Sequence, residues 1–324
     1  MPSTIVVVGV ASLYMSVGVP GFPVEHAPTA VPDWLRSGVT GSAAHISKVL
    51  NGLGDKVRLC TLAGSDPAGL AIRAELQAAG LSGDGVIDAG VTSLGVVLVS
   101  PDGTKLGYPY LAAVNAVGYP AGIFRHLAGG ASLAVLTNTR FASPLIREAR
   151  ELSVPIAVDV HLIADVEDTY NRPWLEAADI VFCSHERLPC PPEEWVARVF
   201  ARYPGCEVVG IGRGPGGAML GLRDGTLVHA GAVAPRGVVS TAGAGDALFA
   251  SFLHGWLASG NPVSALSAAV LHAGWKIGSP LPGESSLTAS ELTRLGAECQ
   301  VRTQMGRWDT VRPGLAGVRL AQRG

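Results

Sequence analysis

The sequence lacks the cysteine patterns that mark metal or redox proteins. Its five cysteines are scattered, and none of them forms a C-x-x-C pair, the spacing typical of zinc sites and redox centres. An odd number of separate cysteines in a chain of this size favours a reducing compartment. We therefore expect a cytoplasmic protein with neither a zinc site nor a redox-active cysteine pair.

Basic runs and long apolar runs are also missing. The formal net charge is −2, and no cluster of basic residues occurs, which argues against a nucleic-acid partner. The apolar run at residues 5–10 is too short to cross a bilayer and has no basic flank, so it predicts neither a signal peptide nor a membrane anchor. The sequence has no G-x-x-x-x-G-K-[ST] motif and therefore no Walker-type phosphate loop.

The chain is instead rich in apolar residues and turn formers. Of its 324 residues, 48% are hydrophobic, and 42 glycines and 22 prolines are present, which suits a large core with many turns. Apolar runs alternate with helical patterns, which predicts an α/β three-layer domain with a mostly parallel sheet. The expected strands are 5–10, 57–64, 131–136, 156–160, 180–183 and 207–211, and the expected helices are 41–53, 67–79, 144–152, 174–178, 193–203, the stretch after Gly245 and 263–274.

Two hairpins interrupt this alternation. Residues 93–111 contain two extended runs around a Pro-Asp-Gly-Thr turn, and residues 218–230 contain a second hairpin. Residues 11–38 carry four prolines and are expected to be irregular. We assign a small β-lid to 11–38 and 91–115, an α/β core that binds ATP and substrate to 1–10, 39–90 and 116–300, and a C-terminal tail to 301–324.

The most informative stretch is residues 238–249. Two β-branched residues end an apolar strand, small residues and glycines follow, and an amphipathic helix then begins. Gly243, Ala244 and Gly245 thus lie at a helix N-terminus, where free N–H groups and the helix dipole favour an anion. Asp246 is a carboxylate beside that site and could accept a proton from an attacking hydroxyl. The alternative is an ordinary helix start with an acidic residue in its favoured place.

A second glycine motif is excluded as a dinucleotide site. Residues 212–217 match G-x-G-x-x-G and follow a strand. The dinucleotide fingerprint requires a helix next, whereas residues 218–222 have the pattern of a strand.

These motifs together resemble the ribokinase-like sugar kinases, also called the phosphofructokinase B family, from about residue 5 to about residue 290. Residues 240–246, Ser-Thr-Ala-Gly-Ala-Gly-Asp, are similar to the family's D-T-x-G-A-G-D. The resemblance implies that Gly243, Ala244 and Gly245 form an anion hole for the transferred phosphoryl group and that Asp246 is the catalytic base.

Other family motifs occur in the family's order. Residues 40–45 take the place of the substrate-binding G-G-x-x-x-N, and residues 112–115 resemble A-G-A-N. The resemblance places Tyr14, Gly41, Ser42, His45, Asn115 and Asp159 at the substrate. It places Gly212, Gly214, Gly217, Thr241 and His272 at the nucleotide. His45 could equally cap or pack its helix.

Several positions depart from the family pattern. The family often has an aspartate where Tyr14 stands, and its motifs have glycine at Thr40 and aspartate at Ser240. The N-x-x-E motif, which organises magnesium, is not intact: Glu186 is the nearest carboxylate, although a gapless match places Arg187 there. Glu186 is therefore the candidate metal-side residue, with an ordinary solvated carboxylate as the alternative.

The expected activity is ATP- and Mg2+-dependent phosphorylation of a hydroxyl on a sugar or sugar-like small molecule. The family's lids often pair between subunits, so the resemblance also implies a homodimer through the lid. Two alternatives remain open: a non-catalytic small-molecule sensor on a kinase scaffold, and a nucleoside or vitamin-precursor kinase.

Overall fold

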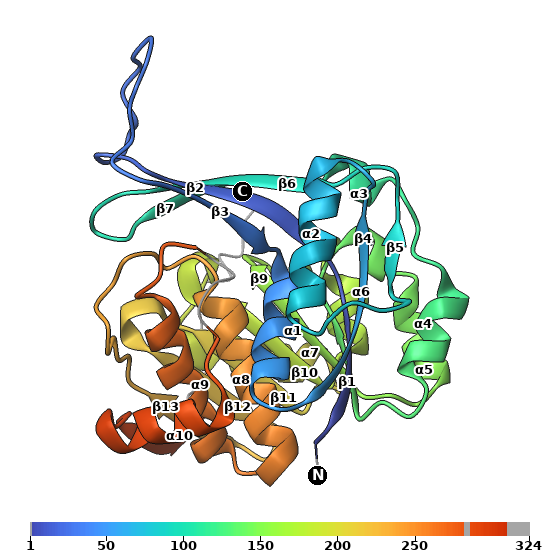
Figure 1. The fold of residues 1–324 in the computed structure, drawn as a ribbon. Helices are drawn as coiled ribbons and strands as arrows, with labels where there is room; N and C mark the ends of the chain where they lie inside the picture. The colour runs from blue at the N-terminus through green and yellow to red at the C-terminus, as the bar shows by residue number, and fades with distance from the viewer. Residues whose placement is uncertain (1, 282–285, 310–324) are drawn as a thin grey trace, which may run out of the picture.

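A large sheet with helices on both faces carries a smaller sheet across one end (Figure 1). The computed structural model describes residues 2–281 and 286–309. The large sheet has the strand order β14-β13-β12-β11-β10-β9-β8-β1-β4-β5. Its strands are β1 (Thr4–Val8), β4 (Lys56–Ala63), β5 (Val86–Asp88), β8 (Leu133–Leu136), β9 (Ile156–Leu162), β10 (Ile180–Ser184), β11 (Val208–Gly212), β12 (Ala218–Leu222), β13 (Thr226–Ala230) and β14 (Thr303–Arg307).

Most of this sheet is parallel, as the alternation of strands and helices predicts. Every neighbouring pair from β5 to β11 is parallel, while β12, β13 and β14 add antiparallel strands at one edge. Because β12 directly follows the 212–217 loop and pairs antiparallel with β11, the exclusion of a dinucleotide motif is confirmed. The carboxyl ends of parallel strands meet at one edge, where α/β proteins bind their ligands.

The predicted C-terminal tail is partly wrong, because β14 belongs to the large sheet. Thr303 to Arg307 pair along the whole of β13. Four of these five residues are exposed, so this edge strand has no apolar run that would reveal it in the sequence. The remainder of the predicted tail, from residue 310 onward, lies outside the described residues.

Two hydrophobic cores separate the sheet from its helical layers. In β1, Ile5 and Val7 face one core, while Val6 and Val8 face the other, as the two-residue period of a strand requires. A strand buried on both faces has no polar side, which explains its continuous apolar sequence. One layer contains α1 (Ser42–Gly52), α2 (Pro67–Ala78), α8 (Ala244–Ser259), α9 (Pro262–Lys276) and α10 (Ala289–Glu298), and the other contains α4 (Ala121–Ala128), α5 (Leu145–Glu151), α6 (Arg172–Ala177) and α7 (Pro192–Arg202).

The smaller sheet is built from the two segments that the sequence assigns to a lid. Its strands are β2 (Ser12–Gly18), β3 (Leu35–Thr40), β6 (Ser93–Val99) and β7 (Lys105–Tyr110), in the order β3-β2-β6-β7. The β2–β3 and β6–β7 pairs are antiparallel, and β2 and β6 are parallel. The expectation that 11–38 is irregular is therefore wrong at both ends of the segment, where β2 and β3 lie. The four prolines lie between these two strands, and they gave the whole segment the composition of a loop.

Within the described ranges, no helix is both long and apolar enough to cross a membrane.

Candidate active site

The glycine-rich turn leads into α8, as the sequence predicts. Gly243 precedes the helix with a φ of 82°, a left-handed conformation that favours glycine. The N–H groups of Gly243 and Gly245 donate to no acceptor in the described part of the chain, whereas the N–H of Ala244 donates to the carbonyl of Thr241 at 3.2 Å. The place of Ala244 among the expected anion-hole donors is therefore corrected: its N–H closes the turn, and the free donors are on either side of it.

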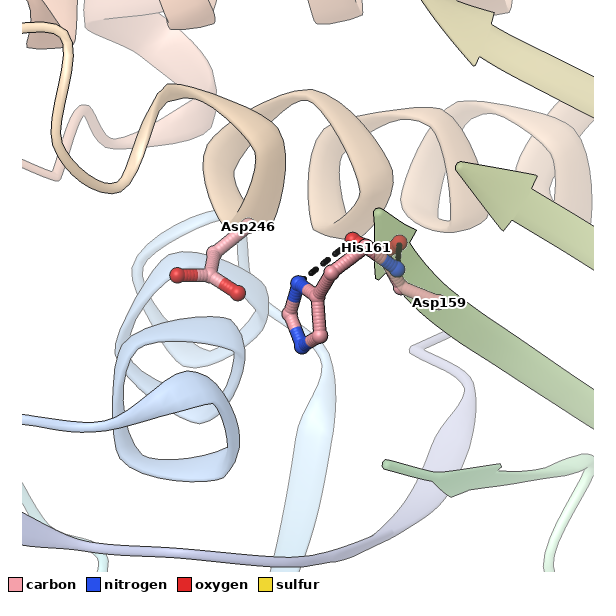
Figure 2. A group of neighbouring side chains, drawn as sticks. All are labelled: Asp159, His161 and Asp246. Carbon is pink, nitrogen blue, oxygen red and sulfur yellow. Dashed lines mark hydrogen bonds and ion pairs between the residues drawn. The ribbon is translucent and has the colours of Figure 1, made fainter. Parts of the chain in front are cut away.

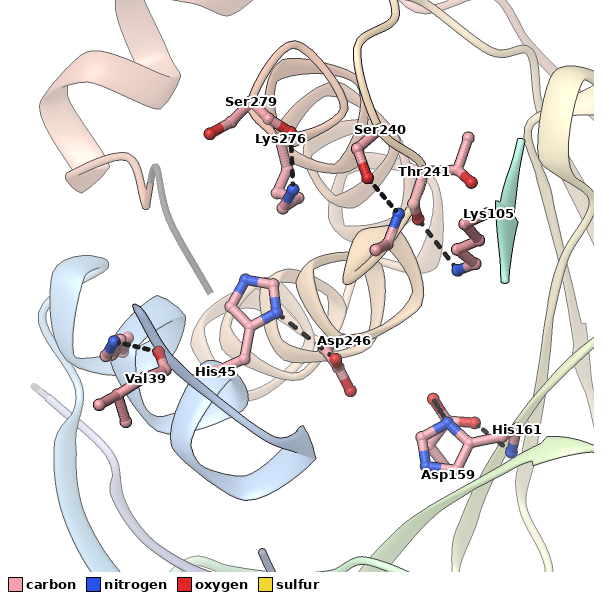
Figure 3. A network of polar contacts seen from close by, with 12 residues as sticks. Val39, His45, Lys105, Asp159, His161, Ser240, Thr241, Asp246, Lys276 and Ser279 are labelled. Carbon is pink, nitrogen blue, oxygen red and sulfur yellow. Dashed lines mark hydrogen bonds and ion pairs between the residues drawn. The ribbon is translucent and has the colours of Figure 1, made fainter. Parts of the chain in front are cut away.

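Asp246 lies in the first turn of α8 with only 16% of its side chain exposed. Its Oδ2 lies 3.4 Å from Nδ1 of His45, while its buried Oδ1 has no hydrogen-bond partner among the described residues (Figure 3). A buried carboxylate oxygen without a partner is unfavourable unless a ligand completes it. The Oδ1 atom is thus free to accept a hydrogen bond from a bound hydroxyl.

His45 is placed differently from the prediction. It lies in the first turns of α1, its side chain is 0% exposed, and it contacts Asp246 instead of an open substrate site. Burial lowers the pKa of His45, and the hydrogen bond to Asp246 partly opposes this shift. A neutral ring with its proton on Nδ1 would donate to the Asp246 carboxylate. The expected substrate contact is corrected to a contact with the candidate base.

Asp159 and His161 extend from β9 toward Asp246 (Figure 2). The three side chains place potential ligand atoms within 4.8 Å of one another. The backbone N–H of His161 donates to Asp159 Oδ1 at 2.8 Å, and Nδ1 of its ring lies 3.7 Å from Asp159 Oδ2. Burial raises the pKa of Asp159, the negative charge of Asp246 adds to that rise, and His161 opposes it. The two carboxylates therefore face a common space from different elements.

Tyr14 reaches this site from the lid strand β2. Its ring lies across its partner Gly95 on β6, where any Cβ would overlap the ring. Burial raises the pKa of the Tyr14 hydroxyl, and the charge of Asp246 raises it further. Tyr14 pairs with Gly95, and Lys105 pairs with Val99 four residues further along the same strand, so the two side chains lie on one face of the lid.

Lys105 extends from the lid strand β7 toward the glycine-rich turn. Its Nζ donates to the carbonyl of Thr241 at 3.3 Å (Figure 3). The hydroxyl of Thr241 donates to the carbonyl of Gly103 at 3.4 Å. Thr241, expected beside the nucleotide, thus makes its protein contacts to the lid. The Lys105 side chain is exposed, but the protein atoms packed around its ammonium lower its pKa, while the negative charges of Glu186 and Asp246 raise it.

Of the three glycines expected beside the nucleotide, Gly212 ends β11, and Gly214 and Gly217 lie in the loop between β11 and β12. Gly214 and Gly217 have φ of 52° and 83°, and a Cβ at Gly217 would overlap the carbonyl oxygen of Ala230. The neighbouring short helix η2 (His185–Arg187) contacts this loop, with Nδ1 of His185 lying 3.0 Å from the carbonyl oxygen of Gly212. Glu186 is exposed on the same short helix, so the candidate metal-side carboxylate and the nucleotide loop are adjacent.

His272 is not placed to contact a nucleotide, which corrects the prediction for this residue. Its side chain is 0% exposed. Nδ1 lies 2.7 Å from the hydroxyl of Ser251, and Nε2 accepts from the N–H of Leu287 at 3.0 Å. Burial lowers the pKa of His272 to about 3. Both ring nitrogens are therefore used inside the core between α8, α9 and the segment before α10.

The remaining predicted substrate residues lie at the start of α1 and at the end of α3, and no hydrogen bond within the described residues joins them to Asp159 or Asp246. Gly41 is the N-cap of α1 with a φ of 94°, and Ser42 is the first residue of that helix. A Cβ at Gly41 would press on the carbonyl of Val10, so the start of α1 can approach the segment between β1 and β2 closely only with glycine. Asn115 ends α3 (Ala112–Asn115), and its buried Oδ1 has no partner among the described residues.

Sequence reasoning missed His161 and Lys105. The signal for His161 was its position two residues after Asp159, on the same face of a strand. The signal for Lys105 was that it is the one lysine in the two lid segments, in a chain with four lysines.

Two named relatives are similar to most of this chain. The chain is 31% identical over 233 residues to an ATP-dependent ribose-1-phosphate kinase from Halopiger xanaduensis, covering 71% of this chain and 77% of that protein. It is 28% identical over 230 residues to an acarbose 7(IV)-phosphotransferase from Actinoplanes sp., covering 70% of this chain and 75% of that protein.

The fold matches a solved structure of a microbiome-derived acarbose kinase with a TM-score of 0.80 at 23% identity, over 92% of this chain and all of that one. The model of the pfkB family carbohydrate kinases matches residues 3–289. The resemblance inferred from the sequence is thereby confirmed, and the chain belongs to the pfkB family of carbohydrate kinases.

Proposed function

We propose that this kinase transfers the γ-phosphoryl group of ATP to a hydroxyl of a sugar or sugar-like molecule, with Asp246 as the general base. One observation carries the proposal. The unpartnered Oδ1 of Asp246 lies in the first turn of α8, next to the free N–H groups of Gly243 and Gly245. A proton acceptor and donors suited to a phosphoryl group are thus combined in four residues.

The chemistry then follows from these groups. Oδ1 of Asp246 accepts the proton of the acceptor hydroxyl as the hydroxyl oxygen bonds to the γ-phosphorus. The bond between that phosphorus and the β,γ-bridging oxygen breaks, and ADP leaves with the electron pair. Negative charge on the phosphoryl oxygens is stabilised by the N–H groups of Gly243 and Gly245. His45 holds the other carboxylate oxygen and so fixes the direction of Oδ1.

The acceptor is bound on the side of Asp159 and Tyr14 in this proposal. Asp159 would accept a hydrogen bond from a second substrate hydroxyl, and the start of α1 with Gly41 and Ser42 and the Asn115 side chain would border the same region. Tyr14 supplies an aromatic face where related kinases often have a carboxylate. The named relatives act on ribose 1-phosphate and on acarbose, so sugar phosphates and glycosides are the first acceptors to test.

The nucleotide is bound on the side of the 212–217 loop, where the glycines allow close approach of the phosphates. Magnesium prefers oxygen ligands, and the exposed carboxylate of Glu186 beside this loop fits that preference. We infer that Glu186 would hold the ion, which supplies charge neutralisation at the β- and γ-phosphates.

The test is an ADP-release assay with ATP, Mg2+ and a panel of ribose 1-phosphate, ribose, acarbose, inosine and pyridoxal. We expect at least one sugar-type acceptor to be phosphorylated. Asp246→Asn should lower kcat by about 10²- to 10⁴-fold, because the neutral amide cannot take the proton.

Asp84→Asn is the matched control, since Asp84 is an exposed carboxylate outside the site, and it should keep full activity. Binding of panel compounds without any turnover would favour the sensor, and turnover of pyridoxal alone would favour a vitamin-precursor kinase. Full activity of Asp246→Asn would refute the assignment of the base.

We also propose that two copies of the chain pair through the outer face of the lid. The support is a row of exposed apolar side chains on the face opposite Tyr14 and Lys105: Met15, Leu94, Leu106, Tyr108 and Tyr110.

A further inference from the structure

The lid and the glycine-rich turn are in direct contact in this structure. The turn between β6 and β7 lies against residues 238–241, where a Cβ on Gly103 would come within 2.8 Å of a methyl group of Val238. The Thr241 side chain donates to the carbonyl of Gly103, and its own carbonyl accepts from Lys105. The structure therefore shows the lid placed against the start of α8.

Through this contact, the lid places the positively charged side chain of Lys105 beside the glycine-rich turn. Its ammonium is held at the carbonyl of Thr241, three residues before Ala244 begins α8. The carboxylates of Glu186 and Asp246 both favour its protonated form. These carboxylates belong to the nucleotide side and the acceptor side of the site, so the ammonium lies in the field of both.

We propose that Lys105 is a further catalytic residue, which donates a hydrogen bond to the phosphoryl group during its transfer and so makes lid closure a condition of catalysis. This inference rests on the proposed function. The Nζ–H that now donates to Thr241 would donate to a phosphoryl oxygen when ATP is bound, with no covalent bond made or broken by Lys105.

Physical chemistry favours a cation at this position. The transferring phosphoryl group carries negative charge on three equatorial oxygens, while the free N–H groups of Gly243 and Gly245 approach it from the turn. An ammonium from the lid adds a full positive charge from a different element. Since β7 carries Lys105, this charge is present only when the lid lies over the turn. Hydrolysis of ATP in an open site would lack the same stabilisation.

Three substitutions separate this role from a simple tether. Lys105→Met removes charge and donor, Lys105→Gln keeps a donor without charge, and Lys105→Arg keeps both. We expect kcat with the best acceptor to fall about 10²- to 10³-fold in the Met and Gln variants, the size found for loss of one charge-stabilising donor. The Arg variant should retain activity within about tenfold, and the acceptor KM should change little in all three.

Lys56→Met is the matched control, because Lys56 is an exposed lysine at the start of β4, and it should match the wild type. The melting temperature of each variant verifies folding. Wild-type activity in Lys105→Gln would show that the residue only tethers the lid, and wild-type activity in Lys105→Met would overturn the proposal outright. If the wild type phosphorylates no acceptor, the proposed function fails before this inference is reached.

Discussion

The pair formed by His45 and Asp246 is the main departure of this site from the family pattern at the scale of single residues. The family motif has asparagine where this chain has His45, and the structure places the imidazole against the candidate base with no exposure to solvent. A buried neutral donor would hold one carboxylate oxygen and leave the other free. His45 is thus a positioning residue in this interpretation, acting on the substrate through Asp246.

We expect His45→Asn to preserve most of this effect, because the asparagine side-chain nitrogen can occupy nearly the position of Nδ1. His45→Ala should lower kcat by about 10- to 100-fold with a small change in acceptor KM, since a displaced base is costly even over a fraction of an ångström. Steady-state kinetics of both variants provide the measurement, with melting temperatures to show that they fold. If both the His45→Asn and the His45→Ala variants had the kcat of the wild type, His45 would only pack in the core and would not position Asp246.

Local sequence patterns predicted the positions of candidate site residues only where the backbone determines those positions. Gly243, Gly245 and Asp246 were identifiable because a helix start has defined donors and a preferred acidic position. His45, His161, Lys105 and His272 depend on which elements pack against them. His45 and His272 occur in similar helical settings in the sequence, yet one contacts the base and the other lies in the core.

At the scale of elements, the loop between β11 and β12 is the most constrained part of the nucleotide side. Gly217 has a positive φ, and its Cα faces the carbonyl of Ala230 so closely that a side chain cannot be accommodated. The neighbouring Gly216 has space, since a Cβ there would meet its nearest atom at 3.4 Å. The loop therefore offers a matched pair of substitutions.

Gly217→Ala should destabilise the fold by at least about 1–3 kcal/mol from backbone strain and raise the KM for ATP, because the loop must shift. Gly216→Ala should stay within about 0.5 kcal/mol of the wild type with an unchanged KM. Denaturant unfolding and ATP titration measure the two effects. An equal rise in the KM for ATP in both variants would contradict the prediction that ATP binding depends on the backbone conformation of Gly217.

Element types were predictable where periodicity is strong, and failed where an element is exposed or short. The continuous apolar run of β1 predicted a strand that is buried on both faces. In contrast, β2 and β3 flank a proline-rich segment, and β14 is an exposed edge strand. None of these three strands has a clear period of apolar residues in the sequence. These three strands form because they pair with other strands of their sheets. Those partners are not visible when only the neighbouring residues in the sequence are considered.

The whole molecule combines segments that are distant in the chain. Tyr14 comes from the lid. Figure 3 shows Lys105 from the lid, His45 from α1, Asp159 from β9 and Asp246 from α8. Their convergence follows from the carboxyl ends of the parallel strands lying at one edge of the sheet, with two helix N-termini and the lid beside them. The order of family motifs predicted this convergence, while distances between the side chains required the fold.

The outer face of the lid leads us to expect that the protein forms a dimer. Because side chains alternate along a strand, Leu106, Tyr108 and Tyr110 share the face opposite Lys105, and they are joined by Met15 and Leu94. Tyr108 is 56% exposed near the middle of this row. A continuous apolar sheet face on the surface marks an interaction site, and a second copy presents the same row for symmetric pairing.

Sedimentation velocity at micromolar concentration should therefore show a dimer for the wild type and a monomer for Tyr108→Glu, because a carboxylate cannot be buried unpaired at the centre of an apolar interface. Leu70→Glu is the control, since Leu70 is 61% exposed on α2, outside the lid, and that variant should remain dimeric. A monomeric wild type would contradict the proposal. If the lid needs its partner to stay in place over α8, Tyr108→Glu should also lose kcat, and a larger loss at lower protein concentration would connect assembly to catalysis.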